Sequence, residues 1–236
     1  MSSSPPSQGS TLVLTNASLF RLIMSFIDGV PGRVVSLVTD FQRSARGVPW
    51  SAVGALPRSV IQRGDLKTLR HLRKLSTTKT FQSRPELVFD GATRCAIQFG
   101  QLEILKYLAD TGLLLNDGSA HSVTINSRTV GSMLMGWAVR YSEALQSTEK
   151  LEIVQWVAAN YSRSALRDVK AEDLSRAGIP VLQILRQREL ATSGLEDPKL
   201  ADLVAKMGKM TTLRFFLERD GARCTADAMD GAATNG

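Results

Sequence analysis

Few residues of this chain have the types and spacing that metal binding or catalysis requires. The two cysteines, Cys95 and Cys224, lie far apart, and neither has ligand-like spacing to His71 or His121, the two histidines. We therefore expect no zinc site and interpret both cysteines as small apolar residues of a reducing, intracellular compartment, cytoplasmic or nuclear. His71 is expected at the surface of a basic helix, and His121 in a loop.

Motifs for other chemistry do not occur either. The sequence has no Gly-x-Gly-x-x-Gly, no Gly-Lys-Ser/Thr, no His-Glu-x-x-His and no Gly-x-Ser-x-Gly. Asp110 and Asp117 lie near glycines but lack the donor spacing of a calcium loop. Without a nucleophile and base, paired carboxylates or a cofactor loop, we expect neither an enzyme nor a bound cofactor.

The charge pattern is more informative. The net charge is +7, and residues 1–100 hold 13 Lys or Arg against 5 Asp or Glu, whereas the rest hold 16 against 17. In residues 58–84 only Asp65 opposes the basic residues Arg58, Arg63, Lys67, Arg70, Arg73, Lys74, Lys79 and Arg84.

This segment predicts one solvent-exposed basic face, formed by Arg63, Lys67, Arg70 and Lys74. Lys67, Arg70 and Lys74 have helical spacing opposite a row of leucines. Such a face either keeps the helix soluble or attracts nucleic acid, acidic lipid or an acidic protein. Nucleic acid is the less favoured partner, because no aromatic residues alternate with the charges.

The elements that position these residues are expected to be helices. The chain has 236 residues, 43% hydrophobic and 22% charged, which is typical of a folded protein with a sizeable core. Its apolar runs are too short to span a membrane, and the stretch over 19–27 lacks the basic start and cleavage site of a signal peptide.

Residues 1–10 are rich in Ser and Pro and are expected to be a disordered lead-in. Residues 11–50 predict a helical hairpin, with one helix over 19–27 and a second over 33–46, which would cap the rest of the chain. A degenerate F-box-like module that recruits a ubiquitin ligase is an alternative for this hairpin, although its leading Leu-Pro is missing.

Residues 51–236 contain a recurring unit of a short helix, a turn at Gly and a second helix. Its turn position recurs roughly every 28 to 42 residues. The turn positions are Gly64, Gly100, Ser142, Gly178, Gly208 and Gly236. Small or apolar residues precede each turn, so we expect neighbouring helices to approach closely, and we expect the glycines to adopt left-handed backbone angles. One unit alone cannot bury its apolar face, which predicts an all-α solenoid of stacked units.

The units resemble the ankyrin repeat. Residues 100–108, Gly-Gln-Leu-Glu-Ile-Leu-Lys-Tyr-Leu, are similar to that family's turn and second helix, and residues 229–236, Met-Asp-Gly-Ala-Ala-Thr-Asn-Gly, to its first helix and turn, in the style of divergent ankyrin-like proteins of oomycetes. The resemblance covers residues 56–236. It departs from the family in the missing Thr-Pro-Leu-His start and in an insertion after Ser142. A helical-hairpin array of the HEAT or tetratricopeptide kind is the alternative.

The resemblance implies a non-enzymatic scaffold that binds another protein along a concave face. The outward residues two places before the turns would contact that partner: Gln98, Arg140, Arg176 and Lys206. Three of the four are basic, which favours an acidic protein surface, although exposed helix positions are commonly basic in any case.

The last unit is expected to be incomplete, because its second helix does not follow Gly236. Met229, Ala232 and Ala233 would then be partly uncovered, and residues 228–235 would fray. We expect a monomer unless this end self-associates.

Overall fold

The computed structural model describes residues 32–44, 54–79, 84–114, 127–142, 148–220 and 224–234. These residues form thirteen α-helices and two short 3-10 helices, and none of them lies in a strand. The prediction of an all-α protein is therefore confirmed. No helix in the described ranges is long and apolar enough to cross a membrane. The chain divides into two compact units, Met1–Ala92 and Thr93–Gly236, which are described separately.

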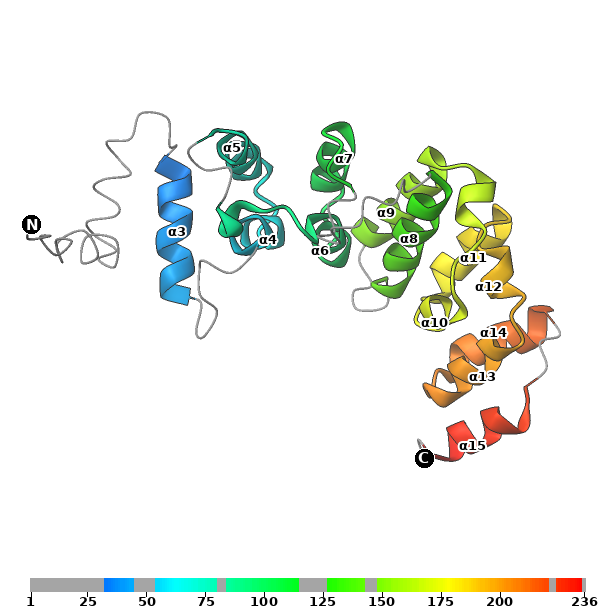
Figure 1. Ribbon diagram of the computed structural model, residues 1–236. Helices are drawn as coiled ribbons and strands as arrows, with labels where there is room; N and C mark the ends of the chain where they lie inside the picture. Colours follow the sequence, from blue (N-terminus) through cyan, green and yellow to red (C-terminus); the bar gives the residue numbers. More distant parts are fainter. Residues whose placement is uncertain are drawn as a thin grey trace, which may run out of the picture. The chain divides into compact units, whose positions relative to one another are not determined.

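The described helices of the first unit are α3 (Gly32–Ser44), α4 (Ala55–Gln62), α5 (Leu66–Ser76) and the 3-10 helix η1 (Pro85–Leu87) (Figure 1). Helix α3 lies where the second helix of the N-terminal hairpin was expected, and it packs on α4 and α5. The predicted lead-in and the predicted helix over 19–27 lie outside the described residues. The role of the hairpin as a cap or as an F-box-like module therefore stays a prediction.

Helices α4 and α5 form an antiparallel pair around a core of buried aliphatic side chains, among them Val60, Ile61, Leu69 and Leu72. Asp65 caps α5, because its carboxylate accepts hydrogen bonds from the backbone N and from Oγ1 of Thr68, at 3.0 and 2.5 Å. The hydrogen bond from the Thr68 hydroxyl lowers the pKa of Asp65. The one carboxylate within the basic segment, Asp65, is therefore engaged as the N-cap of α5.

The helices of the second unit follow in the order α6 (Ala92–Gln98), α7 (Leu102–Asp110), α8 (Ser127–Arg140), α9 (Thr148–Asn160), η2 (Arg163–Leu166), α10 (Ala171–Leu174), α11 (Ile179–Gln187), α12 (Thr192–Leu195), α13 (Lys199–Lys206), α14 (Met210–Asp220) and α15 (Ala226–Thr234). Most of them alternate between two rows. In the first row α10 packs between α8 and α13, and α13 packs against α15 (Figure 1). In the second row α9 packs between α7 and α11. Buried Leu134, Leu174 and Val204 fill the first row, and Leu105, Val154 and Leu182 the second.

The helix-to-helix turns follow the predicted geometry at three glycines. Gly64, Gly100 and Gly208 have φ angles of 70°, 75° and 69°. At each of them the residue after the glycine donates its backbone N–H to the carbonyl five residues back, as Gln101 does to Ala96 at 2.8 Å. Only glycine adopts these angles without strain, which explains its recurrence.

The prediction is wrong at Gly178, whose φ is −78° and ψ 154°. Helix α11 begins directly after this residue with Ile179 and Pro180, so Gly178 acts as the extended N-cap of the second helix. The first helix of the repeat that contains Gly178 is α10, which is correspondingly short and ends at Leu174.

Candidate interaction surfaces

The four residues proposed to contact a partner lie at equivalent places in the second unit. Gln98, Arg140 and Lys206 end α6, α8 and α13, and Arg176 lies in the turn after α10. Gln98, Arg176 and Lys206 are exposed, whereas Arg140 is half-buried. Their positions agree with a row along the ends of the first helices, but the four differ in how accessible their side chains are to a partner.

Arg140 is engaged within the fold. Its Nε lies 2.6 Å and its Nη2 2.5 Å from Oδ1 of Asp173 on α10, a residue that is only 8% exposed. Gly136 on α8 makes room for this pair, because a Cβ there would lie 2.7 Å from Oδ2 of Asp173. The pair joins two adjacent helices of the first row, so the Arg140 charge is largely neutralised before any partner arrives.

Lys206 lies in a groove of mixed charge. The groove has a volume of about 540 Å³ and is formed by α13 and α15. Its charged side chains are Lys199 and Lys206 together with Asp202, Asp227 and Asp230. The sequence pattern did not predict these carboxylates here, because the approach of α15 to α13 is a tertiary contact: a Cβ on Gly231 would lie only 3.0 Å from Cβ of Lys206.

Helix α15 is folded against α13 through Ala228 and Gly231, which are buried, while Met229 is 71% exposed. Asp202 on α13 also accepts hydrogen bonds from the backbone N and Oγ1 of Thr225, at 3.0 and 2.7 Å. Ala233 is exposed as well. Whether residues 228–235 fray stays a prediction.

The proposed basic face lies on α4 and α5 in the first unit. Lys67, Arg70 and Lys74 are exposed, and they alternate along α5 with the buried Leu69 and Leu72. Arg63 follows α4 and lies 3.6 Å from a carboxylate oxygen of Asp40, with both side chains about half exposed. Ion pairs of this kind contribute little, so the face keeps its positive charge.

The remaining candidate residues form no cluster. His71 was expected at the surface but is half-buried, because it lies on α5 one turn from the buried Thr68 and one turn from the buried Leu75. Its Nδ1 is buried with no hydrogen-bond partner in the described structure. Cys95 is buried and Cys224 exposed, and neither forms a disulfide bond. His121 and Asp117 lie outside the described ranges. Within those ranges no three His, Cys, Asp or Glu side chains are grouped to hold a metal ion.

Comparison with protein-family models gave no match, and neither did comparison with curated proteins or with solved structures. The class of the protein must therefore be inferred from its own geometry.

Proposed function

We propose that this chain is a non-enzymatic protein-interaction scaffold, built as a solenoid of degenerate ankyrin-like repeats. The observation that carries the proposal is a set of side-chain hydrogen bonds between residues 32 to 34 positions apart. They run from Arg58 to the Asp90 carbonyl, from Ser132 to the Ala165 carbonyl, from Arg140 to the Asp173 carboxylate and from Lys209 to the Ser175 carbonyl.

This separation supports a repeat array because it is close to the spacing of the turn positions, so each bond joins a residue of one repeat to a residue of the next. When units stack, such residues lie next to each other, and contacts form mainly between neighbours. A period of about 33 residues is that of the ankyrin repeat. The two helix rows of the second unit support the same interpretation, since first helices pack on first helices and second helices on second helices.

An array of this kind presents the ends of its first helices as an extended surface. In this chain Arg176 provides exposed positive charge there, and Gln98 provides an exposed amide. Lys206 is also exposed, although it shares its groove with the carboxylates of Asp202, Asp227 and Asp230. We infer that the partner is another protein, which brings an acidic segment to Arg176 and Lys206 through charge-assisted hydrogen bonds. Arg140 contributes instead to the packing of α8 on α10, through its ion pair with Asp173.

The test is a selection of random peptides by the full chain, followed by affinity measurements on the double variant Arg176→Glu with Lys206→Glu. We expect acidic peptides to be enriched and the double variant to lose at least about tenfold in affinity, because two attractions become repulsions. Arg214→Glu is the matched control, since Arg214 is an exposed residue of α14, 3.9 Å from Glu218. Enrichment of peptides without acidic residues, or equal affinity of all three proteins, would contradict the proposal.

A second candidate function is binding of nucleic acid or another acidic surface by the basic face. The specific observation is that Lys67, Arg70 and Lys74 are all exposed on one helix that carries no carboxylate. Binding of a 20-base-pair DNA duplex would then weaken steeply with salt, and Lys67→Glu with Lys74→Glu would reduce the slope by about two, one for each phosphate contact. A flat salt dependence would exclude this function.

A further inference from the structure

A cavity of about 600 Å³ lies in the second unit, lined by residues from α11 to α14. We call it the α11–α14 cavity. Its wall begins at Arg186 near the end of α11, continues through α12 and the start of α13, and ends at Phe216 on α14. The volume falls within the range of ligand-binding cavities.

The floor of the α11–α14 cavity is apolar. Leu190, Leu200, Ala201 and Phe216 line it, and each of them is at most 3% exposed. Such a floor favours an apolar group of the size of a leucine side chain, because its burial removes further apolar surface from water.

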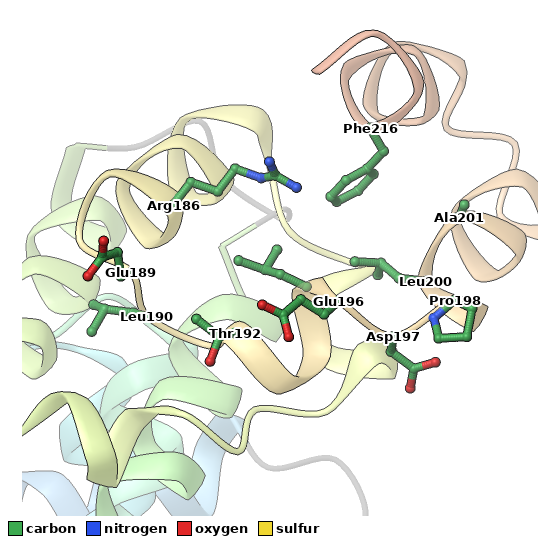
Figure 2. A pocket seen from close by; sticks show the side chains of 11 residues that line it. Arg186, Glu189, Leu190, Thr192, Glu196, Asp197, Pro198, Leu200, Ala201 and Phe216 are labelled. Atoms are coloured by element: carbon green, nitrogen blue, oxygen red, sulfur yellow. The ribbon is translucent and has the colours of Figure 1, made fainter. Parts of the chain in front are cut away.

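The rim is charged and mostly acidic. It carries the carboxylates of Glu189, Glu196 and Asp197 and one cation, Arg186. Figure 2 shows the Arg186 side chain extending toward the Phe216 ring, with Glu196 on the other side of the cavity. The Arg186 guanidinium carbon lies 5.8 Å from the ring centres of both Phe215 and Phe216, so this cation is already placed against aromatic rings.

The three rim carboxylates differ in their engagement. Glu189 pairs with Arg163 at 2.6 Å, although both side chains are largely exposed, and Oδ1 of Asp197 accepts the backbone N–H of Lys199 at 2.9 Å. Glu196 is exposed at the end of α12, beside the apolar floor. The rim therefore offers more negative than positive charge to an incoming group.

We propose that the α11–α14 cavity binds a short segment of a partner protein in which a large apolar side chain is flanked by lysine or arginine. The apolar side chain lies on the floor, and the basic side chains reach Glu196 and Asp197 at the rim. This inference rests on the proposed function only for the source of the segment. It assigns a second contact, of opposite charge preference to the Arg176 and Lys206 surface.

The test uses three blocked tripeptides, titrated into the isotope-labelled full chain and followed by NMR. They are acetyl-Lys-Leu-Lys-amide, acetyl-Lys-Ala-Lys-amide and acetyl-Glu-Leu-Glu-amide. We expect the Lys-Leu-Lys peptide to shift amide signals of residues 190–201 in a saturable manner. The Ala peptide is expected to bind about tenfold more weakly, because it lacks the buried side-chain carbons. The Glu peptide is expected to give no saturable shift there.

The matched variants are Glu196→Gln, which removes a rim charge while keeping the shape, and Glu152→Gln, which removes an exposed charge on α9. Glu196→Gln is expected to raise the Kd of the Lys-Leu-Lys peptide about threefold, which corresponds to the free energy of one exposed ion pair. Glu152→Gln is expected to leave the Kd unchanged. Absence of saturable binding, equal binding of the Glu peptide, or equal effects of the two variants would overturn the proposal. Short peptides probe the cavity alone, so failure here is distinguishable from failure of the Arg176 and Lys206 surface.

Discussion

The Arg140–Asp173 pair gives a structural role to Arg140, which the sequence predicts as an outward residue that contacts a partner. Asp173 is buried, so removal of its partner leaves an uncompensated carboxylate between α8 and α10. A buried pair broken in this way costs about 3–5 kcal/mol, and because the Arg140 side chain is 35% exposed we expect about 2 kcal/mol for Arg140→Met.

Urea denaturation of Arg140→Met measures this loss in the free energy of unfolding. Arg176→Met, at the equivalent exposed position one unit later, is the control and is expected to change stability by less than about 0.5 kcal/mol. Adding Asp173→Asn to Arg140→Met should recover part of the loss. Equal effects of the two single variants would show that the pair is not structural.

Glu189 carries backbone strain at the end of α11. Its φ is 53°, and it occupies the turn position that Gly112, with φ 69°, occupies after α7. Since a left-handed conformation costs a residue with a Cβ about 1 kcal/mol, we expect Glu189→Gly to be about 1 kcal/mol more stable than Glu189→Ala. The comparison with Ala removes the effect of the lost ion pair with Arg163. Equal unfolding free energies of Gly and Ala at this position would contradict the backbone account.

Lys150 is a buried base at the start of α9. It is 3% exposed, its Nζ donates a hydrogen bond of 2.5 Å to the Tyr141 carbonyl, and burial lowers its pKa below the ordinary 10.5. Between the lowered pKa of the folded state and 10.5, the unfolded chain binds the additional proton, so stability should rise with pH in that window.

Lys150→Met removes this ionisation and keeps an unbranched side chain of similar length. We expect the variant's free energy of unfolding to rise less with pH than that of the native chain as pH approaches 10.5, when both are measured by denaturant titration. The same pH slope in both proteins would mean that Lys150 titrates as if it were exposed.

At the scale of elements, the turns contain two kinds of glycine. Some have left-handed backbone angles that only glycine adopts without strain, and others have angles that any residue adopts. Gly208 has φ 69° and no atom within 4 Å of the place that a Cβ would occupy, so Gly208→Ala should cost about 1 kcal/mol through backbone strain alone. Gly178 has φ −78° and an ordinary 3.7 Å contact, so Gly178→Ala meets no backbone strain and should cost about 0.5 kcal/mol, because alanine is a weaker N-cap than glycine. Thermal unfolding of the two variants tests this difference, and a larger loss at Gly178 would refute it.

The helices that could be predicted from the sequence are those with local signals. The pairs α4 with α5, α6 with α7 and α13 with α14 combine apolar spacing with a left-handed glycine, and both signals lie within one pair. The four-residue helix α12 could not be predicted, because four residues show no helical period. Helix α10 was predicted only as the short helix before Gly178, and its early end at Leu174 could not be predicted. The α11–α14 cavity and the Arg140–Asp173 pair depend on contacts between consecutive repeats, which no local sequence pattern specifies.

At the scale of the whole molecule, the proposed scaffold function depends on a regular surface rather than on a reactive group. Two rows of helices fix where the ends of the first helices lie, and the partner would contact side chains spaced one unit apart. Binding energy would then be spread over several units, each of which depends on its neighbours for stability.

The most direct test of the repeat array is an NOE measurement on the labelled full chain. Gly131 on α8 approaches Ala165 so closely that a Cβ on Gly131 would lie 3.1 Å from the Ala165 methyl carbon. The array predicts strong NOEs between the Gly131 α-protons and the Ala165 methyl group, and between the Gly231 α-protons and the Lys206 side chain. Their absence in a spectrum with well-dispersed signals, or strong NOEs from these glycines to other helices, would contradict the stacked repeats on which the proposed function rests.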